Sequence, residues 1–372
     1  MPIRQNDAPS FTDEDRAYMS RALSLAERAL YTTSPNPRVG CVIVRDGRVV
    51  GEGWHERPGG AHAEVAALAT VGGGAAGATV YVTLEPCNHF GRTPPCVHAL
   101  VESKVARVVA ATQDPNPIAQ GGAERLREAG IRVDFGLMED EARELNIGFF
   151  ARNARGRPWM RMKIAASLDG MTALDNGKSQ WITHAEARRD GHHFRARSCA
   201  VLTGIGTVRD DDPQLTVRDV ETTRQPLRVL IDSRFEVPLN AKILTGGNVL
   251  VAGALDDTAK IQALQSAGAE VLVLPNPHGK VELADLVAEL GRRGWNEIHV
   301  EAGNKLNGSL MREGLIDEIV VYLAPSLIGD SGRGMFNLPT LTSLDLRVPL
   351  TIRDVRMIGP DVRLIARVGT LL

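Results

Sequence analysis

The strongest constraint on the fold is a set of three zinc-type ligands carried by two separate segments of the chain. His62 lies in "GGAHAEVAAL", and Cys87 and Cys96 lie in "TLEPCNHFGRTPPC", which follows a predicted strand. Zinc binds nitrogen and sulfur ligands tetrahedrally, and three protein ligands leave the fourth position for water. Both segments have the pattern of strand-to-helix turns, where the helix dipole favours a thiolate. We therefore predict a zinc site formed by His62, Cys87 and Cys96.

Glu64, two residues after His62, is the predicted proton carrier of this site. The H-x-E triplet alone is weak evidence, because a glutamate at a helix start also favours the helix dipole. Beside zinc-activated water, however, the carboxylate can take up and release protons. A purely structural zinc site would need a fourth protein ligand, for which His89 is a candidate.

Length, charge and composition narrow the class of protein. The 372 residues are enough for two domains of ordinary size. A net charge of −2 and an aromatic content of 4% give no support to a nucleic-acid or membrane-surface partner. No run of about 18 apolar residues predicts a membrane span. The polar N-terminal segment lacks a signal core and cysteines are few, so we expect a cytoplasmic protein with reduced thiols.

The first half of the chain alternates between predicted strands and helices. Residues 12–30 have the periodicity of a helix, in which Thr12 and Asp15 form a capping box. The apolar runs on either side of Asp46 and Gly47 predict a β-hairpin. Strands and helices then alternate to about residue 145, which indicates an α/β sandwich with a largely parallel sheet.

A segment rich in Arg, Gly and Pro at residues 149–163 is interpreted as an irregular boundary, and a second α/β series starts at "WMRMKIAASLDG". An amphipathic helix is predicted where Leu283, Leu286, Val287 and Leu290 share one face. The predicted strands carry the sequences "CAVLTG", "LRVLID", "NVLVAG", "AEVLVL", "EIHVEAG" and "EIVVYLAP".

Two long motifs resemble a known family. The loop "TLEPCNHFGRTPPC" and the segment "SPNPRVGCVIV" are similar, nearly word for word, to the bifunctional riboflavin-biosynthesis deaminase–reductase family. Zinc nucleobase deaminases with a P-C-x-x-C loop differ, because eight residues separate Cys87 from Cys96 here. The resemblance covers almost the whole chain. It implies a cytidine-deaminase-like α/β/α sandwich, the deaminase, at residues 1–150, and a dihydrofolate-reductase-like α/β domain, the reductase, at residues 158–372.

The resemblance also implies two reactions. Zn²⁺-dependent hydrolytic deamination of 2,5-diamino-6-ribosylamino-4(3H)-pyrimidinone 5′-phosphate comes first, and NADPH then reduces the ribosyl group to a ribityl group. Asn36, His55 and His89 are the expected pocket residues, since the Asn36 amide can both donate to and accept from a pyrimidine edge. Asn36 could instead only shape its turn. Arg92 could meet the substrate phosphate or only solvent, and Cys41 is expected in the core.

The second half contains five phrases similar to the reductase half of this family: "KIAASLDG", "SQWIT", "TGIGTVRDDDPQLTVR", "VLIDSR" and "VEAGNKL". It lacks a complete G-x-G-x-x-G fingerprint. Free amides after Gly303 can receive the cofactor pyrophosphate. Ser233 and Arg234 suit the 2′-phosphate of NADPH, although Arg234 could also be a solvated turn residue. The expected cofactor-binding residues are Ala165, Trp181, Thr207, Asp211, Ser233, Arg234, Gly303, Asn304, Lys305 and Leu306, of which Asn304 and Lys305 stand where the family usually has Pro and Thr.

In the matched motifs, the resemblance implies Lys163, Asp211 and Glu301 as the catalytic groups, each of which could orient the ribose or move a proton during ring opening. Asp210 and Asp212 flank Asp211, so the register is open, and a run of three aspartates is often only a solvated turn. Arginines suit the 5′-phosphate because of their planar donor geometry. The resemblance implies substrate contacts at Ser179, Arg195, Leu215, Arg218 and Glu301.

Two other interpretations make different demands on the sequence. A nucleic-acid base deaminase with a C-terminal RNA-binding module predicts a P-C-x-x-C loop and a basic, aromatic groove, and the chain has neither. A non-enzymatic zinc-stabilised protein predicts a filled fourth zinc position and a lost proton carrier, whereas Glu64 is present. The expected partner is a small phosphorylated pyrimidine, with no nucleic acid and no membrane. The family resemblance also implies a homodimer or homotetramer assembled through the reductase domain.

Overall fold

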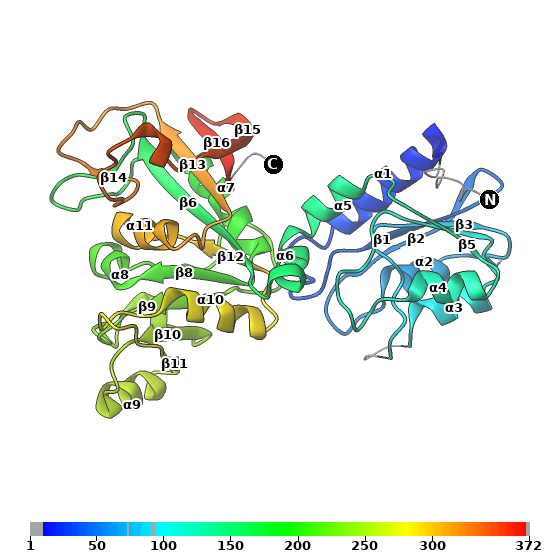
Figure 1. The fold of residues 1–372 in the computed structure, drawn as a ribbon, viewed down its shortest axis with the longest axis horizontal. Coiled ribbons are helices and arrows are strands. Elements are labelled where there is room, and N and C mark those ends of the chain that lie inside the picture. Colours follow the sequence, from blue (N-terminus) through cyan, green and yellow to red (C-terminus); the bar gives the residue numbers. More distant parts are fainter. Residues whose placement is uncertain (1–9, 73, 91–93, 370–372) are drawn as a thin grey trace. The chain divides into compact units, whose positions relative to one another are not determined.

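The computed structural model describes residues 10–72, 74–90 and 94–369 of the chain. These residues divide into two compact units, Met1–Ala154 and Arg155–Leu372 (Figure 1). Each unit has its own sheet and its own hydrophobic core. Within the described ranges, no helix is long and apolar enough to cross a membrane.

The first unit is an α/β/α sandwich, as expected. Its five strands have the order β2-β1-β3-β4-β5, with β1 antiparallel to both neighbours and β3, β4 and β5 parallel. Helices α1 and α5 cover one face, and α2, α3 and α4 cover the other (Figure 1). The elements are α1 (Asp13–Glu27), β1 (Gly40–Arg45), β2 (Arg48–Trp54), α2 (Ala63–Ala69), β3 (Thr79–Val82), α3 (Cys96–Glu102), β4 (Arg107–Ala110), α4 (Gly122–Glu128), β5 (Arg132–Phe135) and α5 (Glu139–Leu145).

Short-range sequence signals set two element ends in this unit. The backbone amide of Thr12 donates to Asp15 at 2.9 Å and the amide of Asp15 donates to the Thr12 hydroxyl at 3.1 Å, which confirms the capping box. Asp46 and Gly47 have φ values of 52° and 71°, as a two-residue hairpin turn requires. The predicted start of α1 and the predicted β1–β2 hairpin are therefore confirmed.

Close contact between β2 and α2 brings the start of α2 onto the sheet. Gly53 makes this contact possible, because a Cβ there would lie 2.3 Å from the backbone nitrogen of Ala67. His62 occupies the N-cap of α2 and Glu64 lies in its first turn. The predicted ligand and the predicted proton carrier are thus held by packed backbone.

The second unit is built on a nine-stranded sheet of order β11-β10-β9-β8-β12-β6-β13-β16-β15. The strands from β11 to β13 run parallel, and β16 and β15 add an antiparallel hairpin at one edge. The predicted amphipathic helix is α10, whose apolar face is buried. The principal elements are β6 (Trp159–Ser167), β7 (Met171–Ala173), α7 (Ala185–Arg197), β8 (Ala200–Gly204), α8 (Ile205–Asp211), β9 (Leu227–Ile231), β10 (Val249–Gly253), α9 (Thr258–Ser266), β11 (Glu270–Val273), α10 (Leu283–Arg292), β12 (Glu297–Val300), α11 (Asn304–Arg312), β13 (Glu318–Ala324), β14 (Arg333–Gly334), β15 (Leu350–Ile358) and β16 (Asp361–Val368).

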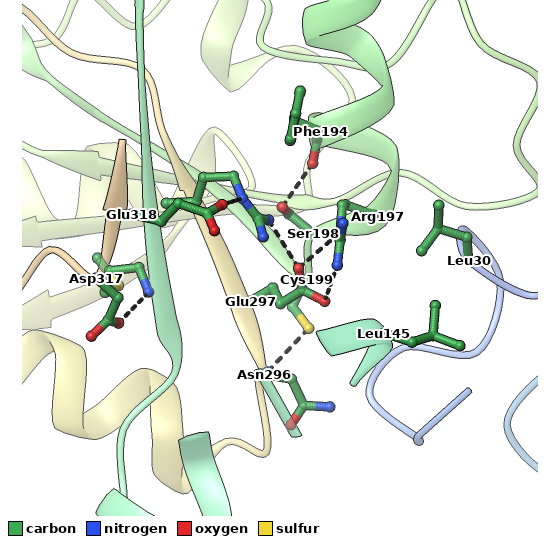
Figure 2. A network of polar contacts seen from close by, with 12 residues as sticks. Leu30, Leu145, Phe194, Arg197, Ser198, Cys199, Asn296, Glu297, Asp317 and Glu318 are labelled. Atoms are coloured by element: carbon green, nitrogen blue, oxygen red, sulfur yellow. Dashed lines mark hydrogen bonds and ion pairs between the residues drawn. The ribbon is translucent and has the colours of Figure 1, made fainter. Parts of the chain in front are cut away.

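A buried ion network crosses this sheet. Arg161 on β6 lies 2.9 Å from a Glu297 oxygen on one side and contacts Glu318 on the other. Arg197 adds a second cation 2.9 Å from Glu297, and Figure 2 shows how Glu297, Glu318 and Arg197 converge. Charges withdrawn from water need such partners, because an unpaired buried charge is strongly destabilising.

The boundary between the two units falls between Ala154 and Arg155, within the expected segment 149–163, but the prediction that this segment is irregular is wrong. Helix α6 spans Ile147–Arg155 and strand β6 begins at Trp159. Phe149 and Ala151 are buried, so tertiary packing stabilises a helix in spite of the nearby Gly and Pro. Gly156, with φ 69°, ends this helix as a left-handed cap.

Candidate active sites

The three predicted zinc ligands lie together in the first unit. The Nδ1 atom of His62 is 3.1 Å from the sulfur of Cys96 and 3.4 Å from that of Cys87, and the two sulfurs are 3.4 Å apart. Tetrahedral zinc with ordinary bond lengths needs edges of roughly 3.5–3.8 Å. The three observed separations are all slightly shorter than these edges, so the atoms need to spread by about half an ångström or less to hold the ion. The donor set suits Zn²⁺ with one open position.

The local electrostatics favour metal binding. A hydrogen bond from the Cys96 thiol and the nearby His62 ring lower the pKa of Cys87 to about 4, against the opposing effect of burial. The Cys87 thiolate in turn raises the pKa of Cys96, because one proton is shared between two close sulfurs. Zinc replaces that proton and takes both sulfurs as thiolates.

Glu64 is buried beside this cluster and faces it. Burial first, and the Cys87 charge second, raise the pKa of Glu64 to about 7. A group with this pKa can both accept and donate a proton near neutral pH. His89 is not a member of the metal-ligand cluster found among the described residues, so nothing in that cluster fills a fourth position.

Asn36 and His55 form a directional pair. His55 Nδ1 lies 2.9 Å from the carbonyl oxygen of Ala61, and its Nε2 lies 3.0 Å from the amide nitrogen of Asn36. The carbonyl can only accept, so Nδ1 carries the proton and Nε2 accepts from Asn36. Burial lowers the pKa of His55, which keeps the ring neutral. The pair therefore points the Asn36 amide in one direction and leaves its oxygen as an acceptor.

His89, Cys41 and Arg92 were the other residues singled out in the first unit. The ring of His89 is half-buried, and its Nδ1 has no hydrogen-bond partner among the described residues. This nitrogen is therefore available to bind a ligand. Cys41 lies in the core on β1, as expected, and burial raises the pKa of its thiol. Arg92 lies outside the described residues.

The second unit brings Lys163, Arg195 and Glu301 together. Arg195 Nη2 lies 2.9 Å from Glu301 Oε2, and Arg195 Nε contacts Oε1 of the same carboxylate. Although burial opposes ionisation, the Arg195 charge holds the pKa of Glu301 well below its usual range. Burial lowers the pKa of Lys163, while the Glu301 charge opposes that shift. The result is a fixed carboxylate beside an amine that gives up its proton more easily than usual.

The three consecutive aspartates have three different partners. Asp211 accepts from the Ser179 hydroxyl at 2.9 Å and from the side-chain Nε2 of Gln180 at 3.2 Å. Asp210 pairs with Arg333 at 3.3 Å, and Asp212 accepts from the Lys242 backbone at 2.8 Å. Asp211 is therefore the aspartate that contacts an expected substrate residue. Sequence reasoning did not identify Gln180, whose position beside Ser179 in "SQWIT" was the available signal.

Two expected substrate residues have surroundings that sequence reasoning did not foresee. The Leu215 side chain is buried in a core cluster with Val201 and Val208, so only its backbone is available to a ligand. Arg195 donates hydrogen bonds to Glu301 and to the Thr216 carbonyl oxygen, which lies 2.9 Å away. Arg218 is exposed, and among the described residues its guanidinium donates to the Gln214 and Thr216 side chains. It is therefore the more accessible of the two arginines.

The expected cofactor residues gather at the carboxyl ends of parallel strands. Thr207 follows β8, Ser233 and Arg234 follow β9, and Gly303 follows β12 as the N-cap of α11. Open α/β sheets bind ligands at this edge. A Cβ on Gly303 would lie 3.9 Å from the Thr207 hydroxyl, so the two segments face each other. Hydroxyl, guanidinium and main-chain amide donors are the groups that a dinucleotide phosphate requires, and the site fits NADPH.

The remaining cofactor candidates differ in accessibility. Trp181 is 69% exposed, and the Arg188 guanidinium stacks 4.5 Å from its ring. Ala165 is half-buried in β6, and Leu306 packs against Gly204, where a Cβ would meet it at 3.0 Å. Asn304 and Lys305 form the first turn of α11, with Lys305 exposed.

Comparison with known proteins decides the family. Residues 12–112 match the cytidine and deoxycytidylate deaminase zinc-binding region, and residues 158–364 match the RibD C-terminal domain. The riboflavin biosynthesis protein RibD of Escherichia coli strain K12 is 47% identical over 363 residues, covering 94% of this chain and 98% of that protein. This chain belongs to the RibD family. The RibD of Aquifex aeolicus is 46% identical and covers 94% of this chain and 97% of its own length.

Solved RibD structures share the whole fold. An Acinetobacter baumannii RibD is 44% identical with a TM-score of 0.89, covering 96% of this chain and 99% of its own. A Thermotoga maritima protein described as a diaminohydroxyphosphoribosylaminopyrimidine deaminase/5-amino-6-(5-phosphoribosylamino)uracil reductase is 31% identical with a TM-score of 0.85, with the same coverage. The RibD-family chain is a bifunctional riboflavin-biosynthesis enzyme with a zinc deaminase and an NADPH-dependent reductase. The predicted fold class is confirmed, and the RNA-binding alternative is not favoured.

Proposed function

We propose that this RibD-family enzyme deaminates 2,5-diamino-6-ribosylamino-4(3H)-pyrimidinone 5′-phosphate and then reduces the ribosyl group of the product to ribityl. The observation that carries the proposal is the His62, Cys87 and Cys96 cluster with Glu64 buried beside it. The relatives named above supply the substrate. We assign the deaminase to residues 1–150 and the reductase to residues 158–372.

In the deaminase, zinc lowers the pKa of water and so supplies the nucleophile of the hydrolysis. Glu64 takes a proton from the attacking water and delivers protons to the ring nitrogen and the leaving amine. Its raised pKa suits both directions of transfer. Asn36 holds the pyrimidine edge, with its oxygen free to accept an N–H because His55 occupies its nitrogen. His89 supplies a further ring donor or acceptor to the same pocket.

In the reductase, NADPH supplies the hydride. Glu301 is held ionised by Arg195, so it accepts a hydrogen bond or a proton from the ribose. Lys163 is the proton donor for ring opening, since burial makes its ammonium more acidic. Asp211 orients Ser179 toward the sugar, and the exposed Arg218 binds the 5′-phosphate. Arg195 uses three of its five N–H donors on Glu301 and the Thr216 carbonyl, and it can offer the other two to that phosphate.

NADPH is held by the loops at the carboxyl ends of the strands. Amides after Gly303 bind the pyrophosphate, and Ser233 and Arg234 bind the 2′-phosphate. The residues assigned to the cofactor remain Ala165, Trp181, Thr207, Asp211, Ser233, Arg234, Gly303, Asn304, Lys305 and Leu306. Leu215 is assigned to the substrate, which it contacts through its backbone.

We assign the active form to a homodimer or homotetramer assembled through the reductase domain. The support is the edge strand β15, which exposes apolar side chains including Ile352, Val355 and Met357. An exposed apolar edge strand in a monomer would promote aggregation. We therefore expect a second copy of the chain to bury this strand in the oligomer. The mass in solution tests this, and Met357→Glu should lower it. We also place the enzyme in the cytoplasm, where its zinc-ligand thiols stay reduced, without nucleic-acid or membrane partners.

Product mass is the direct test of the two reactions. The zinc-loaded enzyme should convert the substrate to the deaminated ribosyl compound alone, and to the ribityl compound only when NADPH is added. Glu64→Gln should stop the first product, and Lys163→Met should stop only the second. Absence of any mass change with zinc-loaded protein would refute the substrate assignment.

A further inference from the structure

Glu85 joins three separate segments next to the zinc cluster. It is buried, with 6% exposure, and stands two residues before Cys87. Its Oε2 accepts from the backbone amide of Asp114 at 3.2 Å, and its Oε1 accepts from the amide of Ala123 at 3.0 Å. Its own amide donates to the carbonyl of Thr112 at 2.9 Å. One side chain therefore ties the loop after β3 to the loop after β4 and to the first turn of α4.

The contacts continue on both sides of Cys87. The amide of Asn88 donates to the carbonyl of Ala119 at 3.2 Å. Gly122 leaves room for the same segment, because a Cβ there would lie 1.8 Å from the carbonyl oxygen of Pro86. The stretch from Glu85 to Asn88 is thus held against residues 112–122 along its whole length.

We propose that Glu85 is a positioning residue for the zinc ligand Cys87. By accepting two main-chain hydrogen bonds, the Glu85 carboxylate fixes the backbone beside Cys87. The Cys87 sulfur is thereby held 3.4 Å from His62 Nδ1 and 3.4 Å from the Cys96 sulfur, ready for the metal. Metal affinity depends on this support, since removal of groups that orient ligands typically lowers affinity 10- to 100-fold. The inference rests on the proposed zinc ligand set and deepens it.

The chemistry requires a carboxylate at this position. Both oxygens of Glu85 accept main-chain N–H groups, and a glutamine has only one acceptor. In Glu85→Gln the new NH₂ group faces one of the two amides, so a buried donor meets a donor. The segment must then shift to separate the two donors, which changes the position of the Cys87 sulfur.

Zinc affinity of the full-length chain, measured by competition with a chromophoric chelator, tests the proposal. Glu85→Gln should bind zinc about tenfold more weakly than wild type. Glu139→Gln is the matched control, because Glu139 accepts from the Thr112 hydroxyl at 3.2 Å but does not contact the Cys87 segment. The control should keep wild-type zinc affinity. Circular dichroism of the metal-free proteins shows whether each variant is folded.

A spectroscopic measurement separates positioning from stability alone. With Co²⁺ in place of zinc, the thiolate charge-transfer and ligand-field bands report ligand geometry, and Glu85→Gln should change them while Glu139→Gln does not. Glu85→Asp keeps the charge but cannot reach both amides, and it serves if Glu85→Gln does not fold. Wild-type affinity and spectra in folded Glu85 variants would overturn the proposal, even if melting temperatures fell. If the wild-type chain itself bound no zinc, the proposed zinc site would fail instead.

Discussion

Arg195 and Glu301 form a two-point ion pair in which the guanidinium holds both oxygens of the carboxylate. The Nη2–Oε2 distance is 2.9 Å, and a third donor of Arg195 holds the Thr216 carbonyl at the same distance. Such bidentate pairs fix orientation as well as charge. Glu301 is consequently presented to the reductase site as an oriented carboxylate rather than as a neutral acid.

Loss of this pair should change the pH dependence of the reductase. The Arg195 charge lowers the pKa of Glu301, so Arg195→Met should raise it. The reduction needs ionised Glu301. As the pH is lowered, the variant should therefore lose reductase activity at a higher pH than wild type does. We expect kcat at neutral pH to fall about 10²-fold, with deamination unchanged. The measurement is kcat for NADPH oxidation across the pH range, with Arg189→Met on the same helix as control. An unshifted acid limb would show that Arg195 does not set the state of Glu301.

Glu64 should be needed for deamination but not for metal binding. Glu64→Gln keeps the shape of the side chain and removes proton transfer. Proton transfer by a positioned side chain typically contributes about 10²- to 10⁴-fold to the rate. Deamination should fall by that range, while zinc content and NADPH-dependent reduction of the deaminated substrate stay at wild-type levels. Zinc stoichiometry and the two separate assays check this. A Glu64→Gln protein without zinc would instead indicate a role in assembling the site.

The aspartate run should separate by function. Asp211→Asn weakens the bond to the Ser179 hydroxyl and should lower reductase kcat about 10²-fold. Asp210→Asn and Asp212→Asn are internal controls, because these residues contact Arg333 and Lys242 instead. Both controls should retain reductase kcat within a few-fold. Equal losses in all three variants would mean that the turn as a whole, rather than Asp211, supports the reaction.

Asp15 should stabilise the deaminase unit in a pH-dependent way. Despite opposing burial, hydrogen bonds from Thr12, Tyr81 and Arg107 lower the pKa of Asp15 to about 2. A depressed folded-state pKa gives stability that is present above the unfolded value of about 3.9 and is lost as the pH falls toward 2. At neutral pH, Asp15→Asn should lower the free energy of unfolding by about 2 kcal/mol.

Thermal or denaturant unfolding at several pH values measures this contribution. The difference between wild type and Asp15→Asn should shrink below pH 4 and nearly vanish at pH 2. Glu14→Gln, one residue away in the same helical turn, should show no such pH-dependent difference. A constant difference at all pH values would assign the effect of Asp15→Asn to packing.

Local sequence was informative where structure depends on neighbours along the chain. The Thr12–Asp15 capping box, the Asp46–Gly47 turn and the apolar face of α10 involve residues within a few positions of one another, so each was predictable. The clustering of His62, Cys87 and Cys96 was also predictable, because their residue types and the long loop between Cys87 and Cys96 form a specific motif. Helix α6 was not predicted, because Gly156 and Pro158 follow it directly, although its Ala and Arg residues favour a helix and Phe149 and Ala151 are buried.

By itself, the sequence determined the residue types of both sites, the order of the two units and the positions of most strands. Only the tertiary structure decided which of these residues meet. Arg195 and Glu301 are 106 residues apart, and Ser179 and Asp211 are 32 apart, yet each pair is in hydrogen-bond contact. Leu215 carries no local sign of its burial, and Glu85 none of its bonds to Asp114 and Ala123. The physical reason is that strand order brings distant segments to one edge of a sheet, and side-chain partners there depend on packing rather than on spacing along the chain.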